Sequence, residues 1–340
     1  MRKRGYPRSG RTRCMTSVHI VGMGLAGALA SWELLKRGAH VTAWDDATGD
    51  TSSNVAAGMI TPITGQRLKP TWRGQELMEQ ASRTYEDIER HYGVVLRRDW
   101  RLRRVFRDAA MHDWFRRRFD GGEFDDYGVT EIHPGECDGV GYPYGGMKHG
   151  NVVTIDIPTL VRAVRTSVAW TSDPGPTSAI VDCTGYRALN DPLWSWLPIE
   201  PSKGEILDVA IPGLGLDEIL TNGTWILPIG DDRYRIGATH DWDDHDPQPT
   251  EQARLYLLES AQRMVSQEII VTGHRAALRP STKFKRPLVG RHPHDHRHYT
   301  LNGLGTKGAL QGPFAAAQLA ACILDGVEPD DEINISRWHQ

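Results

Sequence analysis

The sequence predicts an α/β protein in which a parallel-sheet nucleotide-binding domain is interleaved with an antiparallel-sheet α+β domain. A strand–turn–helix–strand unit opens the chain at residues 18–45, and elements of the same kind return in its middle and at its end. Between them, short strand patterns at 204–210, 224–229 and 233–238 are separated by turn residues, which is typical of antiparallel hairpins. Two interleaved domains therefore fit better than two consecutive ones.

The opening unit has the spacing of a dinucleotide-binding turn, G-x-G-x-x-G, between a strand and a helix. The residues of this turn are Gly22, Gly24, Leu25, Ala26 and Gly27. The first glycine permits the tight turn, the second lets the backbone approach a pyrophosphate, and the third allows close helix–strand packing. Asp45 ends the second strand, where a carboxylate can accept hydrogen bonds from ribose hydroxyls. This Rossmann-type unit does not by itself distinguish FAD from NAD.

Composition excludes several classes of protein. The 340 residues include 40 Lys+Arg and 43 Asp+Glu, so the net charge of −3 provides no general attraction for nucleic acid or anionic lipid. The four cysteines are far apart and form no metal-binding pair, so we expect a reducing, cytoplasmic location, and no metal. No apolar run is long enough to span a bilayer. Residues 1–16 lack an apolar core and are expected to be a disordered tail.

From residue 51 onward the chain resembles the D-amino-acid-oxidase superfamily of flavoproteins, and glycine oxidase in particular. The matching motifs are TSSNVAAGMI, AIVDCTGYRA, PSKGEIL, TWILPIGDDRYRIGATHDW, ALRPSTKFKRPLVGRHP and NGLGTKGALQGP. The resemblance implies a GR2/DAO-like fold with an FAD-binding domain at 17–66, 150–200 and 275–330. It implies a substrate domain at 67–149 and 201–274.

The same resemblance implies which residues contact FAD. Beyond the glycine turn and Asp45, these are Ser53, Ala57, Gly58, Met59, Thr184, Gly185, Gly303, Gly305, Thr306, Lys307, Gly308 and Ala309. The backbone N–H groups of the last glycine-rich loop, at a helix N-terminus, suit the negative charge of a reduced flavin. No cysteine occurs in that loop, so we expect FAD to be bound non-covalently. Lys307 could add a charge there or point into solvent.

Arg279 is the residue that the resemblance assigns to the substrate carboxylate. Independently, a planar and always charged guanidinium offers two parallel donors to a carboxylate, and Pro280 stiffens the adjoining backbone. Trp225 and Tyr234 either form walls of the substrate pocket or belong to the core. We therefore expect hydride transfer to flavin N5 from a small amino acid or secondary amine carboxylate, such as glycine, sarcosine or a D-amino acid, with O₂ or another acceptor reoxidising the flavin.

Two other functions stay open. A 2-hydroxy-acid dehydrogenase could use the same fold. A flavoprotein acting on tRNA is the other, because nine arginines lie among Trp and Phe at 97–118. Neighbouring acidic residues instead favour a solvated or internally paired face for that segment, so nucleic acid is not the expected partner. The histidine-rich stretch at 292–298 is expected to be a surface turn rather than a metal site.

Overall fold

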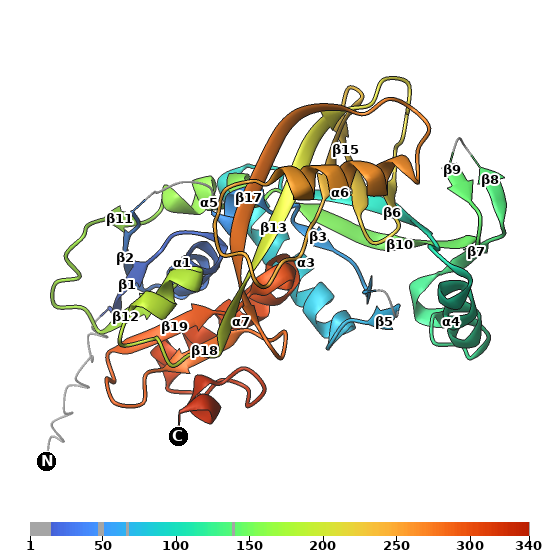
Figure 1. Cartoon of the computed structure of the whole chain (residues 1–340). Helices are drawn as coiled ribbons and strands as arrows, with labels where there is room; N and C mark the ends of the chain where they lie inside the picture. The colour runs from blue at the N-terminus through green and yellow to red at the C-terminus, as the bar shows by residue number, and fades with distance from the viewer. Residues whose placement is uncertain (1–14, 47–50, 66–67, 138–139, 340) are drawn as a thin grey trace, which may run out of the picture.

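The computed structural model describes residues 15–46, 51–65, 68–137 and 140–339, and within them two large sheets (Figure 1). The first is six-stranded, in the order β11-β2-β1-β12-β19-β18. Its strands are β1 (Ser17–Val21), β2 (His40–Trp44), β11 (Ala169–Trp170), β12 (Ala179–Asp182), β18 (Leu288–Arg291) and β19 (His298–Asn302). All neighbours run parallel except β18, which is antiparallel to β19. Three segments far apart in sequence thus build one sheet.

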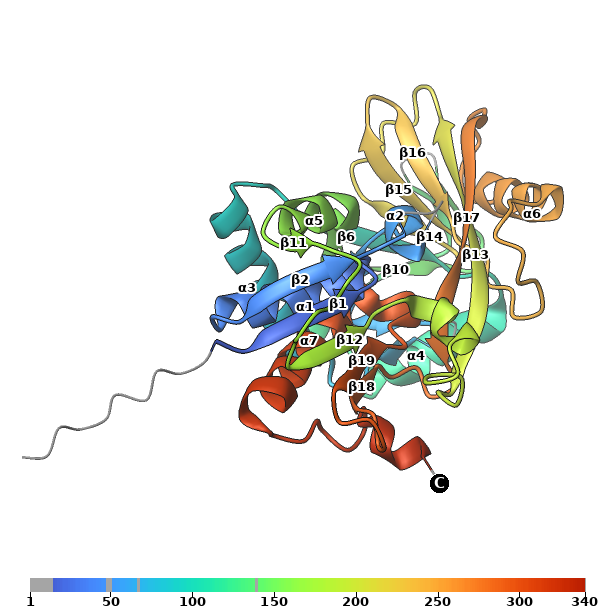
Figure 2. The same cartoon turned by 90° about the vertical axis from the view of Figure 1, so that its left-hand side faces the viewer.

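Helices pack on this sheet and on one another. They are α1 (Leu25–Lys36), α3 (Gly74–Tyr92), α5 (Ile157–Arg165) and α7 (Gly308–Asp325). Helix α1 contacts both α5 and α7, and α3 also packs on α7 (Figure 2). The buried Tyr85 of α3 donates its hydroxyl proton to the Ala309 carbonyl at 2.6 Å, which ties α3 to the start of α7. The largest apolar core of the described chain lies between these helices and the sheet.

The second sheet has nine strands in the order β17-β13-β16-β15-β14-β6-β10-β3, with β7 also paired to β10. These are β3 (Met59–Ile60), β6 (Arg97–Val105), β7 (Thr130–Ile132), β10 (Gly146–Ile155), β13 (Ile199–Ala210), β14 (Ile219–Thr221), β15 (Trp225–Gly230), β16 (Arg233–Gly237) and β17 (Ile270–Thr282). Its pairs are antiparallel except β6 with β14. Helix α6 (Glu251–Gln262) lies across one face, where Leu257 and Ala261 pack on the sheet (Figure 1).

Smaller elements complete the described chain. Helix α4 (Ala109–Asp120) follows β6 and buries Met111 and Phe115 in a separate apolar cluster. Helix α2 is one turn, and two short strand pairs and four 3-10 helices connect the larger elements. Their bounds are α2 (Ser52–Val55), β4 (Ile63–Thr64), β5 (Lys69–Pro70), β8 (Gly135–Cys137), β9 (Val140–Tyr142), η1 (Asp125–Tyr127), η2 (Gly185–Asn190), η3 (Gly305–Lys307) and η4 (Ile335–Trp338).

The predicted fold class is confirmed. Strand β17, which carries Arg279, pairs with β13 along its whole length, from Ile199↔Thr282 to Ala210↔Ile270. The long partner strand stabilises β17 beyond its local apolar signal, since tertiary pairing can override local propensity. Arg279 therefore lies within a strand. The predicted domain boundaries stay a prediction, and β17 crosses the one at 275.

No helix in the described part of the chain combines the length and the apolar character needed to cross a bilayer. The histidine-rich stretch forms the turn between β18 and β19 and the first residue of β19, His298. His292 accepts hydrogen bonds from the backbone N–H groups of His294 and Asp295, at 3.3 and 3.0 Å. Within the residues that are described, no three His, Cys, Asp or Glu side chains are grouped as a metal site.

Candidate active site

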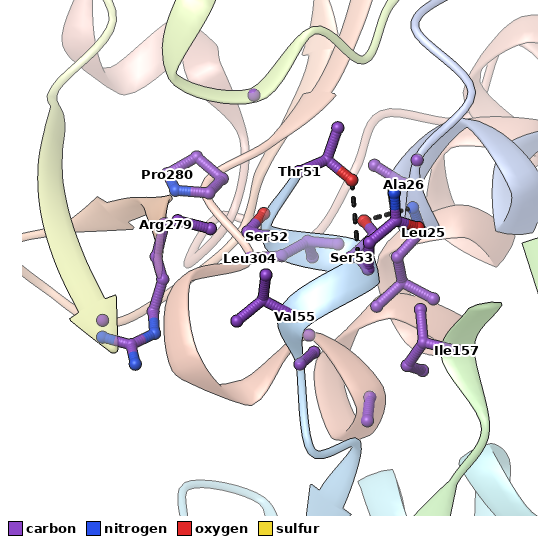
Figure 3. A pocket seen from close by; sticks show the side chains of 18 of the residues that line it. Leu25, Ala26, Thr51, Ser52, Ser53, Val55, Ile157, Arg279, Pro280 and Leu304 are labelled. Atoms are coloured by element: carbon purple, nitrogen blue, oxygen red, sulfur yellow. Dashed lines mark hydrogen bonds between the residues drawn. The ribbon is translucent and has the colours of Figure 1, made fainter. Parts of the chain in front are cut away.

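A cavity of about 570 Å³ is lined by residues of both sheets. It extends from the glycine turn after β1, past the one-turn helix α2, to Arg279 and Pro280 on β17 (Figure 3). The first sheet contributes the turns at the carboxyl ends of β1, β2 and β12, and the second contributes β13, β15 and β17. Ligands of open α/β sheets bind beyond the carboxyl ends of parallel strands, so the position itself is that of a nucleotide site.

The glycine turn has the backbone geometry that its sequence predicts. Gly22 has φ +91° and donates its N–H to the Trp44 carbonyl at 2.8 Å, which joins the turn to the end of β2. A Cβ on Gly27 would lie 2.0 Å from the Gly22 carbonyl oxygen, so a side chain there would force α1 away from β1. Ser53 Oγ accepts a hydrogen bond from the Leu25 N–H at 2.9 Å (Figure 3). The N-terminus of α1 thus faces the cavity with α2 beside it.

Asp45 lines the other end of the cavity, next to α5. Its Oδ2 pairs with Arg165 Nη1 at 2.7 Å, an interaction that the sequence did not predict. Arg165 also stacks on Trp170, with its guanidinium carbon 4.2 Å from the ring centroid. The ion pair fixes the carboxylate of Asp45, while its remaining lone pairs leave it able to accept hydrogen bonds from a ribose.

Most of the predicted cofactor residues line this cavity. They are Gly22, Gly24, Leu25, Ala26, Asp45, Ser53, Ala57, Gly58, Met59, Thr184, Gly185, Gly305, Thr306, Gly308 and Ala309. Gly27 instead lies beneath the turn, and Gly303 and Lys307 line an adjoining cavity of about 360 Å³. Lys307 Nζ donates to Thr64 Oγ1 at 3.3 Å and Thr71 Oγ1 at 3.4 Å, so its charge points toward those threonines. Their assignment to the cofactor stays a prediction.

Arg279 is held at the opposite end of the cavity by close packing on the neighbouring strand. Its guanidinium lies over Gly204 of β13, where a Cβ would come within 2.0 Å of the Arg279 Cζ. Nη1 and Nη2 donate to the Thr239 carbonyl at 3.2 and 3.3 Å, and Nη1 also contacts His240 Nδ1 at 3.3 Å. Burial lowers the pKa of Arg279 to about 10, so the group stays charged at neutral pH.

No carboxylate among the described residues pairs with Arg279, which leaves its charge for a ligand. Its neighbour His240 is kept neutral, because burial, followed by the charges of Arg279 and Lys285, lowers its pKa to about 4. The donors of this buried guanidinium contact neutral groups, so its positive charge is not compensated and favours the binding of an anion. This arrangement favours the predicted role of Arg279 over a structural ion pair.

Gly204 provides a test of this packing that does not substitute Arg279 itself. In Gly204→Ala the new methyl group would overlap the guanidinium, so Arg279 must shift. We expect KM for carboxylated substrates to rise about 10-fold to 100-fold while FAD content is unchanged, because misplacing a positioning group costs that much. Steady-state kinetics together with the flavin content of the purified protein check it. Unchanged KM would show that the guanidinium does not need its place over Gly204.

Of the two predicted pocket aromatics, the structure brings only Trp225 to the cavity. Its ring lies over Gly237, whose Cβ would be 2.6 Å from Trp225 Cζ2. Of the two positions left open for Tyr234, the pocket wall is wrong and the core is right. Strand alternation places Tyr234 on the opposite face of the sheet, under α6, where its hydroxyl accepts a hydrogen bond from the Leu216 N–H at 3.3 Å. It is a core residue.

Sequence reasoning missed Gly204, Thr239 and His240, which all line the cavity beside Arg279. A signal existed for Gly204, because a glycine inside a strand often marks a close approach of another group. Thr239 and His240 carry no local signal. They follow β16 directly, and only the pairing of β16 with β13 brings them to Arg279.

The family model described as DAO, FAD dependent oxidoreductase, matches residues 17–169 and 148–322 of this chain. The chain belongs to this family. Two curated relatives extend over most of it. "Uncharacterized oxidoreductase YurR" of Bacillus subtilis is 24% identical over 91% of this chain and 95% of its own length. The "tRNA 5-methylaminomethyl-2-thiouridine biosynthesis bifunctional protein MnmC" of Marinobacter nauticus is 22% identical over 88% of this chain, which spans 54% of that protein.

Two solved structures share the fold. Iminodiacetate oxidase from Chelativorans sp. BNC1 superposes with a TM-score of 0.76 at 22% identity, covering 94% of this chain and 98% of that one. Glycine oxidase from Geobacillus kaustophilus also gives 0.76, at 18% identity and coverages of 95% and 98%. The resemblance to glycine oxidase is thereby confirmed at the level of fold and family. The protein is an FAD-dependent oxidoreductase.

The cavity fits the FAD that the DAO family binds. The backbone N–H groups at the start of α1 would face a pyrophosphate bound at the glycine turn, and Asp45 would accept hydrogen bonds from a ribose. Gly58 has φ +65° and approaches the Ile155 carbonyl so closely that a Cβ would lie 1.9 Å from its oxygen. Because Gly58 has no side chain, the segment after α2 can pack closely against the end of β10. Non-covalent attachment stays a prediction.

Proposed function

We propose that this protein oxidises the C–N bond of a small amino acid or a secondary amine that carries a carboxylate. The observation that carries the proposal is Arg279, a buried guanidinium that has no acidic partner among the described residues and lines the same cavity as the glycine turn. The names of the similar structures, glycine oxidase and iminodiacetate oxidase, support the same substrate class.

Arg279 binds the carboxylate through two parallel N–H donors, which fixes the α-carbon as well as attracting the ligand. Trp225 and Ala238 form an apolar wall beside it, so the carboxylate is the part of the substrate that is held by charge. FAD, when bound, supplies the acceptor for the two electrons and the hydrogen of the α-carbon. The substrate leaves as an imine, which water hydrolyses.

We assign no general base for this chemistry among the residues that the structure describes. Neutral His240 contacts Arg279 through Nδ1, which orients the guanidinium, and we assign it only this positioning role. A substrate amine that enters in its neutral form needs no side chain to remove its proton. O₂ or a further electron acceptor completes the cycle.

Anaerobic reduction of the flavin by a set of candidate substrates distinguishes the proposed function from its two alternatives. Glycine and glycolate differ only in amine against hydroxyl, so reduction of the flavin by glycolate and not by any amine would indicate a 2-hydroxy-acid dehydrogenase. Bulk tRNA is tested in the same assay, because the relative MnmC is named for tRNA modification. We expect bleaching by at least one small carboxylated amine and no effect of tRNA. Reduction by tRNA alone would overturn the proposal.

A further inference from the structure

A second cavity, of about 640 Å³, opens directly from the one that contains Arg279. The two cavities share the lining residues Met59, Gly223, Trp225, Ala238, Thr239 and His240. Beyond them, the second cavity is lined by the segment 61–65, by β6 and by residues of α6. A ligand bound at Arg279 therefore has room to continue past Trp225 into this space.

Arg104 of β6 lines the second cavity and forms few hydrogen bonds for a buried arginine. Its side chain is buried, with the residue 8% exposed, yet Nε has no hydrogen-bond partner among the described residues. Nη1 reaches the Gly65 carbonyl at 3.5 Å, the limit of a hydrogen bond. In the described part of the chain no carboxylate forms an ion pair with it. An isolated buried charge of this kind is costly unless a ligand supplies its counterion.

Several neighbouring arginines, unlike Arg104, have acidic partners. Arg101 and Arg103, on the opposite face of β6, pair with Asp217 and Glu218. Further along the segment, Arg116 and Arg118 pair with Glu131 and Glu123. Strand alternation instead turns Arg104 to the face of Trp100 and Leu102, which packs toward Trp225.

Other charges at this cavity do not neutralise Arg104. Arg107 and Arg263 are exposed and add positive charge to its wall. The buried Glu205 is already engaged, with Thr250 donating its N–H and hydroxyl at 2.8 and 2.9 Å and His274 Nε2 lying at 2.8 Å. Asp241 accepts the backbone N–H groups of Asp243 and Asp244. Burial, followed by repulsion from Arg107, lowers the pKa of Arg104 to about 10, so it remains charged.

We propose that Arg104, assisted by Arg107, binds a second anionic group of the substrate, so that the preferred substrates are amines carrying two carboxylates. This rests on the proposed function, in which Arg279 takes the first carboxylate. One end of the molecule is then held in each cavity, with the oxidised C–N bond between them near Trp225. Arg104 is a specificity-determining residue in this arrangement.

Binding is tested without turnover by thioether acids, in which sulfur replaces the amine nitrogen. Thiodiacetate and its homologues with two or three methylene groups on one arm carry two carboxylates, and (methylthio)acetate carries one. Their dissociation constants for the FAD-loaded protein are measured by the change in the flavin spectrum and by calorimetry. We expect at least one diacid to bind about 10-fold to 100-fold more tightly than the monoacid.

Substitutions test whether Arg104 is responsible for the preference for a diacid. In Arg104→Met this preference should disappear while the affinity for (methylthio)acetate stays the same, and Arg104→Lys should keep part of it. Arg101→Met, an exposed arginine on the other face of β6, is the matched control and should keep all of it. Arg104→Met should also unfold at an equal or higher temperature, because it removes an uncompensated buried charge. A large loss of thermal stability would instead indicate a structural role.

The outcomes separate this inference from the proposed function. If small monocarboxylated amines reduce the flavin but no diacid is preferred, or the preference survives in Arg104→Met, the second subsite is wrong and the first proposal stands. If no small amine reduces the flavin, the proposed function fails, whatever the thioethers do. Binding of tRNA that is lost in Arg104→Met, with no diacid preference, would replace the small substrate by a nucleic-acid phosphate and overturn the inference.

Discussion

Replacing Arg279 by methionine should raise KM for carboxylated amines about 100-fold to 1000-fold and leave the FAD content unchanged. Removing one partner of a buried, hydrogen-bonded charge pair costs several kcal/mol, which corresponds to this change in binding. Methionine fills the space over Gly204 without a charge. Arg279→Lys should recover only part of the loss, because an ammonium group cannot bind a carboxylate through two parallel donors.

Arg235→Met is the control for Arg279→Met. It removes an arginine of the same sheet that pairs with Asp208 at 3.1 Å and lines neither cavity, and Asp208 keeps its second partner Arg275. We expect at most a small loss of stability and an unchanged KM. If Arg279→Met and Arg235→Met behaved alike in steady-state kinetics, Arg279 would not be the carboxylate-binding residue.

Gly27→Val should abolish stable FAD binding. The Cβ position lies 2.0 Å from the Gly22 carbonyl oxygen and 3.2 Å from Ile20 Cγ2, so the helix must move away from β1. That movement displaces the turn and the N–H groups at the start of α1, and overpacking of this kind costs about 1–3 kcal/mol of folding free energy. The ratio of flavin to protein absorbance after gel filtration should fall at least about 10-fold, which corresponds to a loss of about 1.4 kcal/mol or more of binding free energy.

Gly38→Ala is the matched glycine at the other end of α1. Gly38 has φ +80°, but nothing lies within 4 Å of the Cβ that alanine would add. It should therefore lower thermal stability through backbone strain of about 1–3 kcal/mol and keep its FAD. Equal loss of FAD in the two variants would mean that general destabilisation, and not the shape of the turn, controls FAD binding.

The parts of the site that could be predicted are those that local backbone chemistry dictates. The glycine turn needs particular residues at fixed offsets between a strand and a helix, and Arg279 precedes a proline within a motif that resembles the family. Asp45 follows from the length of the same β-α-β unit. These features are readable because a few neighbouring residues determine them.

The rest depends on pairings between distant strands. The sequence left Tyr234 open between the pocket and the core because hairpin register cannot be read from sequence, and a shift of one residue exchanges the two faces. Thr239 and His240 reach Arg279 through β13, which is separated from β16 by two further strands along the chain. Arg104 looked like one of nine similar arginines at 97–118. Its burial, together with the lack of an acidic partner among the described residues, distinguishes it.

Anaerobic reduction of the bound flavin by N-methylglycine and by dimethylamine tests the central proposal most directly. Both compounds are secondary amines with an N-methyl group, and only N-methylglycine carries the carboxylate that Arg279 would bind. Iminodiacetate is added as a second carboxylated amine. We expect the visible absorbance of the oxidised flavin to bleach with at least one carboxylated amine and to persist with dimethylamine at the same concentration. Bleaching by dimethylamine at an equal rate, or by none of the three, would contradict it.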